Sequence, residues 1–557
     1  MMEEAKIGVF VCRCGTNIGG YLDVPALVNY SKGLPNVVCA QENLYTCSEA
    51  GLNEIKEAII DHQLNRVIVA SCTPRTHEPL FRNTCKEAGL NPYLFEFVNI
   101  RDQCSWVHMH ETEKATEKAK DLIRMGVARA KLLEPQEEIE VDVVPSALVI
   151  GGGIAGMTCA LSLADRGFEV TLVEREEKLG GMLRKLYKLY SAQTDASQLI
   201  EAKIGEIEKH RNIEVLTSAT VTEVKGFYGN YDVTIRQERK NVPFRVGVIV
   251  VAIGAEEFKP VGMYGYDGIQ IVTQLELEEM LKEDRVKAHS IVMIQCVGAR
   301  DEKRSYCAKV CCTTALNNAM IISERNPKAQ IFMLYRDLQT YGTIYEDLYK
   351  KAREKGIIFV KYSPQNPPIV DKGMVKVFDE FLGEELRLPY ELVVLSTPMV
   401  AHPDSGELAK ILKVPIDEYG FFLEAHVKLR PLDFATDGVY VCGSAHWPVT
   451  VDESIVQGYG AASRASIPMS RRRVVSEPIV SFVDEESCIG CGLCEMICPF
   501  KAIQIEETPK GKIAQTIVAS CKGCGTCGAA CPQKAITMRH FKDEQMLAEI
   551  VALMERK

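Results

Sequence analysis

A glycine-rich turn between two apolar segments constrains the fold of this chain more than any other feature. Residues 147–170 read ALVIGGGIAGMTCALSLADRGFEV, in which Gly151, Gly153 and Gly156 follow a predicted strand with the spacing G-x-G-x-x-G. The first glycine permits a tight turn, the second a close approach of the backbone to a pyrophosphate, and the third close packing of helix against strand. The next predicted strand ends at Glu174, about 20 residues beyond the loop, where an acid can accept the hydroxyls of a ribose. This order of elements predicts a dinucleotide site in a parallel α/β sheet.

Three later stretches favour FAD over NAD as the ligand of this loop. The strand VIVVAIG (248–254), the strand DGVYVCG (437–443) and the helix ESIVQGYGAA (453–462) follow in the order found in flavoproteins with two dinucleotide domains. Each stretch alone is compatible with an ordinary buried element, but the order points to a flavin. We therefore predict a split FAD domain of residues 143–257 and 408–470. Its candidate cofactor-binding residues are Gly151, Gly153, Ile154, Ala155, Gly156, Glu174, Arg175, Gly181, Met182, Ala252, Gly254, Gly443 and Ser444.

Residues 258–407 interrupt that domain at the place where such a flavoprotein carries its NAD(P)H domain. A predicted strand at 290–295 opens the insert, but the glycine turn that would bind nucleotide phosphates is missing. Four cysteines follow instead, and Cys307 and Cys311 would lie one turn apart if the segment is helical. Four thiolates suit the soft, tetrahedral irons of an iron–sulfur cluster, with a redox dithiol or core cysteines as the alternatives. We predict a [4Fe-4S] cluster on Cys296, Cys307, Cys311 and Cys312.

Two identical cysteine patterns follow an arginine-rich linker at 471–477. Both read C-x2-C-x2-C-x3-C-P, the pattern of bacterial two-cluster ferredoxins, in which the fourth cysteine of each run ligates the cluster of the other run. Zinc would not require the doubled pattern. A ferredoxin domain at 478–540 is thus predicted, followed at 541–557 by an amphipathic helix that packs on its own chain or docks a partner. The predicted ligands are Cys488, Cys491, Cys494 and Cys531 for one [4Fe-4S] cluster and Cys521, Cys524, Cys527 and Cys498 for the other.

Residues 1–134 alternate predicted strands and helices and are expected to form a separate small α/β domain. Cysteines stand at or just past the ends of its predicted strands, and such strand ends share one edge of a parallel sheet. The candidates are Cys12, Cys14, Cys47 and Cys72, with Cys104 in a predicted loop as a fifth. The pattern allows a further [4Fe-4S] cluster, or a core in which these cysteines are buried as small apolar residues.

Composition excludes several classes of protein. The 557 residues include 21 cysteines and no secretory signal is recognisable, so metal clusters explain the cysteines better than disulfides do. A net charge of −10 argues against nucleic acid as a partner and favours a solvated hinge for the arginine-rich linker. Apolar runs stay shorter than the about 18 residues of a membrane span. We expect a cytoplasmic protein without a membrane span.

The chain resembles the HdrA family, the A-type subunits of heterodisulfide reductase, over nearly its whole length. The resemblance rests on the doubled cysteine run and on the stretches FVCRCGTNIGG, RVIVASCTPRTHEP, AGLNPYLFEFVNIRDQCSWVH, VIGGGIAGM and QCVGARDEKRSYCAKVCC. It implies an oxidoreductase subunit with a thioredoxin-reductase-like, two-dinucleotide flavoprotein fold, FAD and [4Fe-4S] clusters. It also implies an anaerobic multi-subunit complex, whose partners include B- and C-type subunits, a hydrogenase, formate dehydrogenase or similar donor module, and ferredoxin.

Two departures from longer family members leave the mechanism open. No C-x-x-C occurs between Gly156 and Gly254, so this is a short form without the inserted ferredoxin domain. Members in which FAD bifurcates electron pairs usually carry a lysine five residues after the paired cysteines, and here Asn317 stands at that position. A neutral amide stabilises a reduced flavin less than a lysine does. Bifurcation or confurcation and plain electron relay therefore both remain, and the alternative of another class is a self-contained NAD(P)H-dependent FAD and iron–sulfur oxidoreductase.

Overall fold

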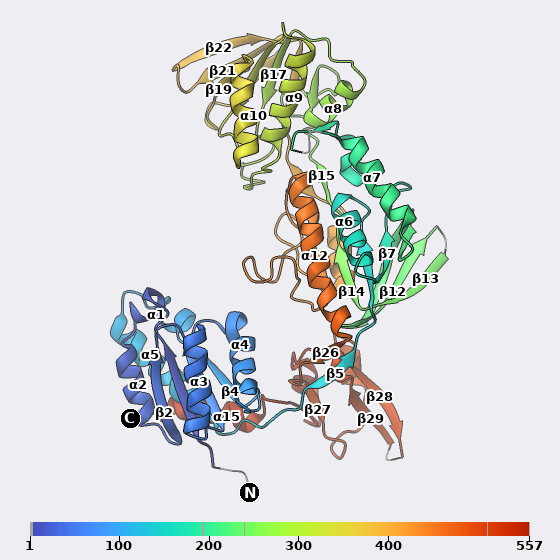
Figure 1. The fold of residues 1–557 in the computed structure, drawn as a ribbon. Helices are drawn as coiled ribbons and strands as arrows, with labels where there is room; N and C mark the ends of the chain where they lie inside the picture. The colour runs from blue at the N-terminus through green and yellow to red at the C-terminus, as the bar shows by residue number, and fades with distance from the viewer. Residues whose placement is uncertain (1–3, 192–193, 239, 510, 556–557) are drawn as a thin grey trace. The chain divides into compact units, whose positions relative to one another are not determined.

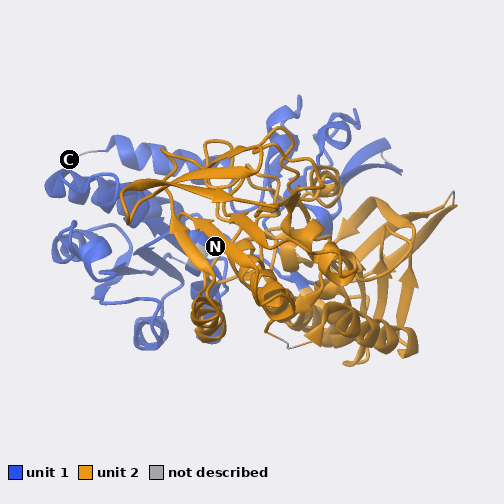
Figure 2. Cartoon of the chain, turned by 90° about the horizontal axis from the view of Figure 1, so that it is seen from above, with its two compact units in different colours: residues 1–140, 475–557 blue, residues 141–474 orange. Residues whose placement is uncertain are grey.

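The computed structural model of this chain describes residues 4–191, 194–238, 240–509 and 511–555. They form two compact units, one of residues 1–140 and 475–557 and the other of residues 141–474 (Figure 2). Within the described ranges, no helix combines the length and the apolar character needed to cross a membrane.

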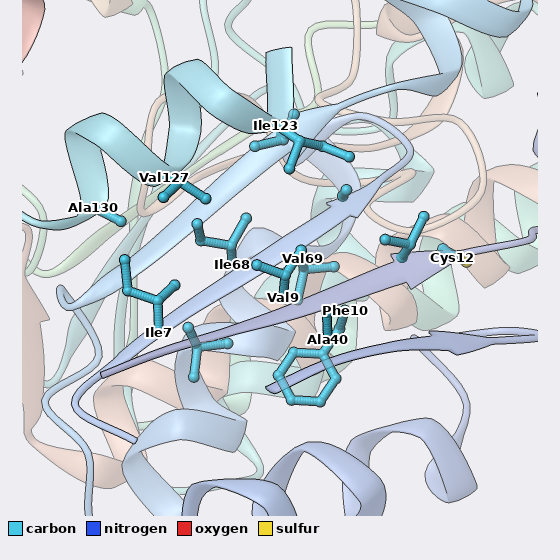
Figure 3. Close-up of a cluster of buried hydrophobic side chains, with 14 of the residues drawn as sticks. Ile7, Val9, Phe10, Cys12, Ala40, Ile68, Val69, Ile123, Val127 and Ala130 are labelled. Atoms are coloured by element: carbon cyan, nitrogen blue, oxygen red, sulfur yellow. The ribbon is translucent and has the colours of Figure 1, made fainter. Parts of the chain in front are cut away.

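The first unit begins with a four-stranded parallel sheet in the order β2-β1-β3-β4 (Figure 1). Its strands are β1 Ile7–Cys12, β2 Val37–Asn43, β3 Arg66–Ser71 and β4 Phe95–Asn99. The run IGVFVC of β1 is buried throughout, as expected for a parallel strand covered on both faces. The side chains of Ile123, Val127 and Ala130, from helix α5 (Thr112–Ala130), cover one face of the sheet (Figure 3). Helices α2 Val24–Lys32, α3 Glu49–Asp61 and α4 Pro74–Glu87 complete this domain.

The cysteine-rich C-terminal part of the same unit has an internal repeat. Two short helices, α13 (Leu493–Ile497) and α14 (Thr526–Ala530), each follow a glycine in the left-handed conformation. Two antiparallel strand pairs accompany them: β27 Ser481–Val483 with β30 Ile536–Met538, and β28 Ile503–Thr508 with β29 Gly511–Thr516.

The C-terminal helix α15 (Asp543–Met554) packs on α5 of the first domain. The side chain of Arg124 donates to the Ala552 carbonyl at 2.7 Å, and that of Gln545 donates to the Leu132 carbonyl at 2.8 Å. The amphipathic helix expected at 541–557 is therefore present and contacts its own chain, while residues 556–557 lie outside the described ranges.

The second unit is built on two parallel five-stranded sheets. The first has the order β10-β7-β6-β14-β25, and its last strand comes from far along the chain. Its strands are β6 Ser146–Ile150, β7 Glu169–Val173, β10 Ile213–Leu216, β14 Val248–Val251 and β25 Val439–Val441. Helices α6 (Ile154–Ala164) and α12 (Val451–Arg471) pack against each other beside this sheet (Figure 1). A three-stranded antiparallel sheet is formed by β11 Ala219–Phe227, β12 Asn230–Gln237 and β13 Lys240–Val246.

The insert contains the second parallel sheet, in the order β16-β23-β17-β18-β19. Its strands are β16 Ile271–Thr273, β17 Ser290–Ile294, β18 Gln330–Tyr335, β19 Ile358–Lys361 and β23 Leu392–Leu395. Helices α8 Gln274–Lys282, α9 Cys311–Arg325 and α10 Thr343–Glu354 pack with it. The chain enters and leaves the insert through one antiparallel pair, β15 (Ala255–Glu257) with β24 (Met399–Ala401).

Candidate functional site

A large pocket lies in the second unit, where the glycine loop joins β6 to α6. Its volume of about 790 Å³ falls in the range of about 300–1,000 Å³ that is common for small-molecule sites. Every predicted cofactor-binding residue except Gly156 and Gly443 lines it. Residues from four separate stretches, around Gly151, Glu174, Ala252 and Ser444, are thereby brought together.

The three glycines of the loop occupy their positions for different structural reasons. Gly151 has a φ of +111°, and a Cβ on it would lie 2.3 Å from the Ala252 carbonyl oxygen. A Cβ on Gly156 would lie 1.9 Å from the carbonyl oxygen of Gly151, so fold packing alone requires these two glycines. A Cβ on Gly153 would meet nothing within 4 Å. The open space at Gly153, at the first turn of α6, is a cradle that a pyrophosphate can fill.

Glu174 is held rigidly at the end of β7. Its carboxylate accepts the backbone N–H groups of Gly152 at 2.7 Å and of Glu176 at 2.9 Å. Each carboxylate oxygen has a further lone pair available for a ribose hydroxyl. The guanidinium of Arg175 lies at the pocket edge, where it pairs with Asp404 at 3.0 Å.

The four cysteines of the insert converge at the end of β17. Cys296, Cys311 and Cys312 are buried and Cys307 is half-buried. Burial raises the pKa of the Cys296 thiol to about 11, and the charges of Cys312 and Cys307 act in the same direction. A hydrogen bond with Cys312, burial and the charges of Cys312, Cys296 and Cys307 likewise raise the pKa of the Cys311 thiol, so the four thiols are neighbours. The helix α9 begins at Cys311, so the condition of a helical segment through Cys307 and Cys311 is not met.

The segment around Cys307 is instead a series of turns. The sulfur of Cys307 accepts the backbone N–H of Lys309 at 3.3 Å, and Lys309 has a φ of +63°. The Lys309 ammonium pairs with Glu453 of α12 at 2.5 Å, which ties the turn to the helix that flanks the large pocket. This irregular segment therefore brings Cys307 to the N-terminus of α9 without being helical itself.

A second cavity, of about 150 Å³, shares lining residues with the large pocket and is also lined by Cys311. Met182, Met399 and Val449 line both spaces, and Cys311 and Asn317 line the second. The side-chain amide of Asn317 donates to the Lys188 carbonyl at 2.8 Å. A group bound in the pocket would thus lie across a short, mostly apolar space from Cys311.

In the ferredoxin-like part, one cavity is lined by cysteines from both runs. Cys488, Cys491 and Cys494 of the first run line it together with Cys531 of the second. This is the crossed set expected for one cluster. Backbone N–H groups reach the sulfurs: Ala514 donates to Cys488 at 3.4 Å. In the second run, the charges of Cys521 and Cys524 add to burial in raising the pKa of Cys527.

The N-terminal domain also brings four of its cysteines together. Burial raises the pKa of Cys47, and the charges of Cys12, Cys72 and Cys14 contribute to the rise. Figure 3 shows Cys12 at the end of β1, where parallel strands place ligand-binding residues.

Cys104 does not belong to this group. It lies in a π-helical turn (Arg101–Ser105) rather than in the expected loop, and it is completely buried. Burial raises the pKa of its thiol to about 11, and the charges that act on it are those of Lys118 and Asp121. Within the described ranges, no group of three or more His, Cys, Asp or Glu side chains is arranged for a single metal ion. A single ion needs all its ligands around one point, whereas each thiolate of a [4Fe-4S] cluster binds its own iron.

Sequence reasoning missed the arginines beside the cysteines. Arg300 and Arg336 lie near Cys296, and Arg101 lies near Cys14. Only Arg300 carried a signal, because it follows Cys296 by four residues. The approach of Arg336 depends on the pairing of β17 with β18.

Comparisons with known proteins identify the family. Residues 145–299 match the family described as pyridine nucleotide-disulphide oxidoreductase, and residues 481–538 match the 4Fe-4S dicluster domain. The chain is 38% identical to an A-type iron–sulfur subunit of the CoB–CoM heterodisulfide reductase of Methanopyrus kandleri, with 98% of each chain covered. It is also 38% identical to the A-type subunit of the H2:CoB–CoM heterodisulfide, ferredoxin reductase of Methanothermobacter thermautotrophicus, with 99% of this chain and 98% of the relative covered. The chain belongs to the HdrA family of heterodisulfide reductase subunits.

Family membership confirms two predictions. The chain is an oxidoreductase subunit, and its fold class is a thioredoxin-reductase-like flavoprotein fold with a small α/β domain before it and a 4Fe-4S dicluster domain after it. The alignment with the Methanopyrus kandleri relative extends over 646 positions, more than the 557 residues of this chain, so that relative carries segments that are absent here. A solved thioredoxin reductase of T. acidophilum, 15% identical, covers 58% of this chain and 97% of its own length with a TM-score of 0.41.

Proposed function

We propose that this chain is the FAD- and iron–sulfur-containing electron-transfer subunit of a cytoplasmic, heterodisulfide-reductase-like complex. Bound FAD would supply the exchange between electron pairs and single electrons, and the clusters would carry single electrons. The observation that carries the proposal is a pair of neighbouring cavities that share Met182 as a lining residue, one lined by the glycine loop and the other by Cys311.

The residues of the large pocket fit FAD. The first turn of α6 presents free N–H groups beside the open space at Gly153, which suits a pyrophosphate. Glu174 is positioned for the ribose hydroxyls. Met182 and Ser444 also line the pocket, and Met182 lines the second cavity together with Cys311.

Three groups of four cysteines fit [4Fe-4S] clusters under this proposal. They are the two crossed sets of the ferredoxin domain and the set Cys296, Cys307, Cys311 and Cys312. The set Cys12, Cys14, Cys47 and Cys72 is proposed as a fourth, because these thiols also converge at one sheet edge. Iron analysis of the fully loaded chain should give about 16 irons, or about 12 without the N-terminal cluster. A value near 8 would remove the insert cluster.

The ferredoxin domain is proposed as the contact to partner subunits. Cys491 and Cys524 are exposed, so their clusters would lie near the surface. Ile489 and Met496, beside the first run, are 62% and 76% exposed. An apolar rim around an exposed ligand suits a redox protein such as ferredoxin or a B- or C-type, hydrogenase or formate dehydrogenase subunit.

We propose plain electron relay rather than bifurcation for this short form. Asn317 lines the cavity beside Cys311 with a neutral amide, which donates one hydrogen bond to the Lys188 carbonyl. It therefore adds no positive charge that would stabilise a reduced ring. A potentiometric titration of the loaded chain tests this point, because relay predicts two one-electron flavin steps in normal order and bifurcation predicts strongly inverted ones.

A self-contained NAD(P)H oxidoreductase is disfavoured by the insert. The strand β17 runs into Cys296 instead of a glycine turn, and the cavity at Cys311 is smaller than the about 300 Å³ of typical ligand sites. An anaerobic spectral titration of the loaded chain with NADH and NADPH decides between the two functions. We expect no flavin bleaching with either nucleotide and full reduction by a low-potential dye. Rapid bleaching by a nucleotide would overturn the relay proposal.

A further inference from the structure

Two arginines flank the insert cysteines from neighbouring strands. Arg300 lies in the turn after β17, and Arg336 directly follows β18. One nitrogen of Arg300 donates to the Asp337 carboxylate at 2.8 Å, and Arg336 donates to the Arg300 carbonyl at 2.9 Å. The parallel pairing of β17 with β18 therefore fixes both guanidinium groups at the same sheet edge as Cys296.

Each guanidinium has one buried donor that forms no hydrogen bond with the described residues. These donors are Nη1 of Arg300 and Nε of Arg336. A buried charged donor without an acceptor is strongly unfavourable, so a structure normally supplies one. The charges of Arg336 and Arg300 oppose the burial that raises the pKa of Cys296, which means that both groups lie close to its sulfur. The sulfurs at Cys296 are therefore the acceptors that these two donors would use.

Resting on the proposed cluster, we infer that Arg300 and Arg336 donate charge-assisted hydrogen bonds to the sulfurs of the cluster bound by Cys296, Cys307, Cys311 and Cys312, and so raise its reduction potential. Hydrogen bonds to sulfur, net charge and burial are the means by which proteins set cluster potentials. Reduction adds one electron and neither forms nor breaks a bond. Because both arginines are already protonated, they offset the added charge without taking up a proton.

The arginines distinguish the insert cluster from the clusters of the ferredoxin domain, a difference that the cysteine spacing alone does not indicate. In the ferredoxin domain, the donors to Cys488 and Cys498 are the backbone N–H groups of Ala514 and Ala502. At the insert, full positive charges are added in a buried setting, where electrostatic interactions are stronger. The insert cluster would thereby retain an electron more readily than it would without the arginines.

The test uses the full, cluster-loaded chain in a dye-mediated redox titration followed by EPR spectroscopy. The signal of the insert cluster is assigned by its loss in Cys312→Ala. In Arg300→Gln and in Arg336→Gln, we expect the ratio of reduced to oxidised insert cluster to fall about tenfold at the wild-type midpoint, which is ~59 mV for one electron. The signals of the ferredoxin domain and the iron content should not change. Arg300→Lys keeps the charge but loses the planar fork, so its shift should be smaller.

Arg304→Gln is the matched control. It removes a positive charge from the same turn, but its guanidinium lies over the Phe258 ring at 4.1 Å and donates to the Gly298 carbonyl. We expect no comparable shift of the reduction potential in this variant.

If the loaded wild type shows no EPR signal that Cys312→Ala removes, the proposed insert cluster itself fails. If the cluster is present and its potential is unchanged in both glutamine variants, the inference on the arginines is overturned. If a glutamine variant loses the cluster, the reduction potential is measured in Arg300→Lys instead. A wild-type potential in Arg300→Lys would overturn the inference that the guanidinium of Arg300 hydrogen-bonds the cluster.

Discussion

The ferredoxin domain and the insert arrive at groups of four cysteines by opposite routes. In the ferredoxin domain, three cysteines come from a single short turn, and the fourth from the equivalent turn of the repeat. In the insert, Cys296 follows the strand β17, Cys307 lies in an irregular segment and Cys311 opens the helix α9. Cys491 and Cys524 are exposed, whereas Cys296 and Cys312 are 6% and 2% exposed. The first arrangement suits electron exchange with other proteins, and the second suits exchange with a neighbouring cofactor.

The largest expected effect tests the crossed ligation in the ferredoxin domain. Cys531→Ala should remove about four irons, because its cluster takes its other ligands from the first run. Adding Cys488→Ala should cost no more iron, since both residues serve one cluster. Adding Cys521→Ala instead should bring the loss to about eight irons. Iron analysis with EPR measures this, and the reverse pattern for the two double variants would show uncrossed ligation.

Iron removal should separate the two regions next. The ferredoxin domain has a small core, in which the proposed cluster ligands Cys494 and Cys527 are packed with Ile503, Ala514 and Ile536. Metal binding then contributes much of the folding free energy. After anaerobic chelation, protease should cleave residues 478–540 at least about tenfold faster than before, because the unfolded form becomes populated.

The insert should resist the same treatment. Its core is formed by apolar side chains that bind no cluster, among them Leu277, Met293, Leu316 and Leu348. Fragment masses from limited proteolysis identify the cleaved region. Equal acceleration of cleavage in both regions would remove the contrast drawn here.

The flavin pocket offers a third comparison, between glycines of one loop. Gly153→Val places a side chain in the open cradle, and we expect FAD affinity to fall on the order of 100-fold with little loss of apoprotein stability. Gly156→Ala should instead destabilise the fold, since its Cβ would lie 1.9 Å from the Gly151 carbonyl oxygen. Fluorescence titration with FAD and thermal unfolding of the apoprotein distinguish the two. Wild-type affinity in Gly153→Val would contradict the proposed pyrophosphate position.

The last expected effect is a pH dependence of the stability of the second unit. Burial raises the pKa of Glu278, in the cavity beside Cys311, from the ordinary 4.5 to about 7. Because the folded state holds this proton more tightly, the stabilisation is complete below about pH 4.5 and is lost as the pH rises toward 7. Glu278→Gln should lower the pH dependence of the unfolding free energy by about 3 kcal/mol between pH 4.5 and 7.5. Denaturant unfolding of both apoproteins at several pH values measures it, and parallel curves would refute it.

The sequence was most informative for motifs whose residues are close together both along the chain and in space. The doubled cysteine run and the loop at Gly151 are local, so their geometry follows from a few consecutive residues. The spacing of Cys307 and Cys311 is compatible with a helical period, but it does not determine a helix, and the chain is irregular at Cys307. Arg336 could not be predicted, since it reaches Cys296 only through the pairing of β17 with β18. The sequence indicates that cysteines gather at the edge of the N-terminal sheet, as Cys47 and Cys72 do. It does not indicate which cysteines take part, since Cys104 lies elsewhere.

The strand β25 has a consequence for the order of events during synthesis. It completes the first sheet by pairing with β14, with Val250 opposite Tyr440. The ribosome must therefore translate the whole insert before the flavin domain can close, while the insert, with its own apolar core, is free to fold first. Cofactor loading into the pocket thus becomes a late step in the life of the nascent chain, after the sulfur ligands of the insert are already arranged.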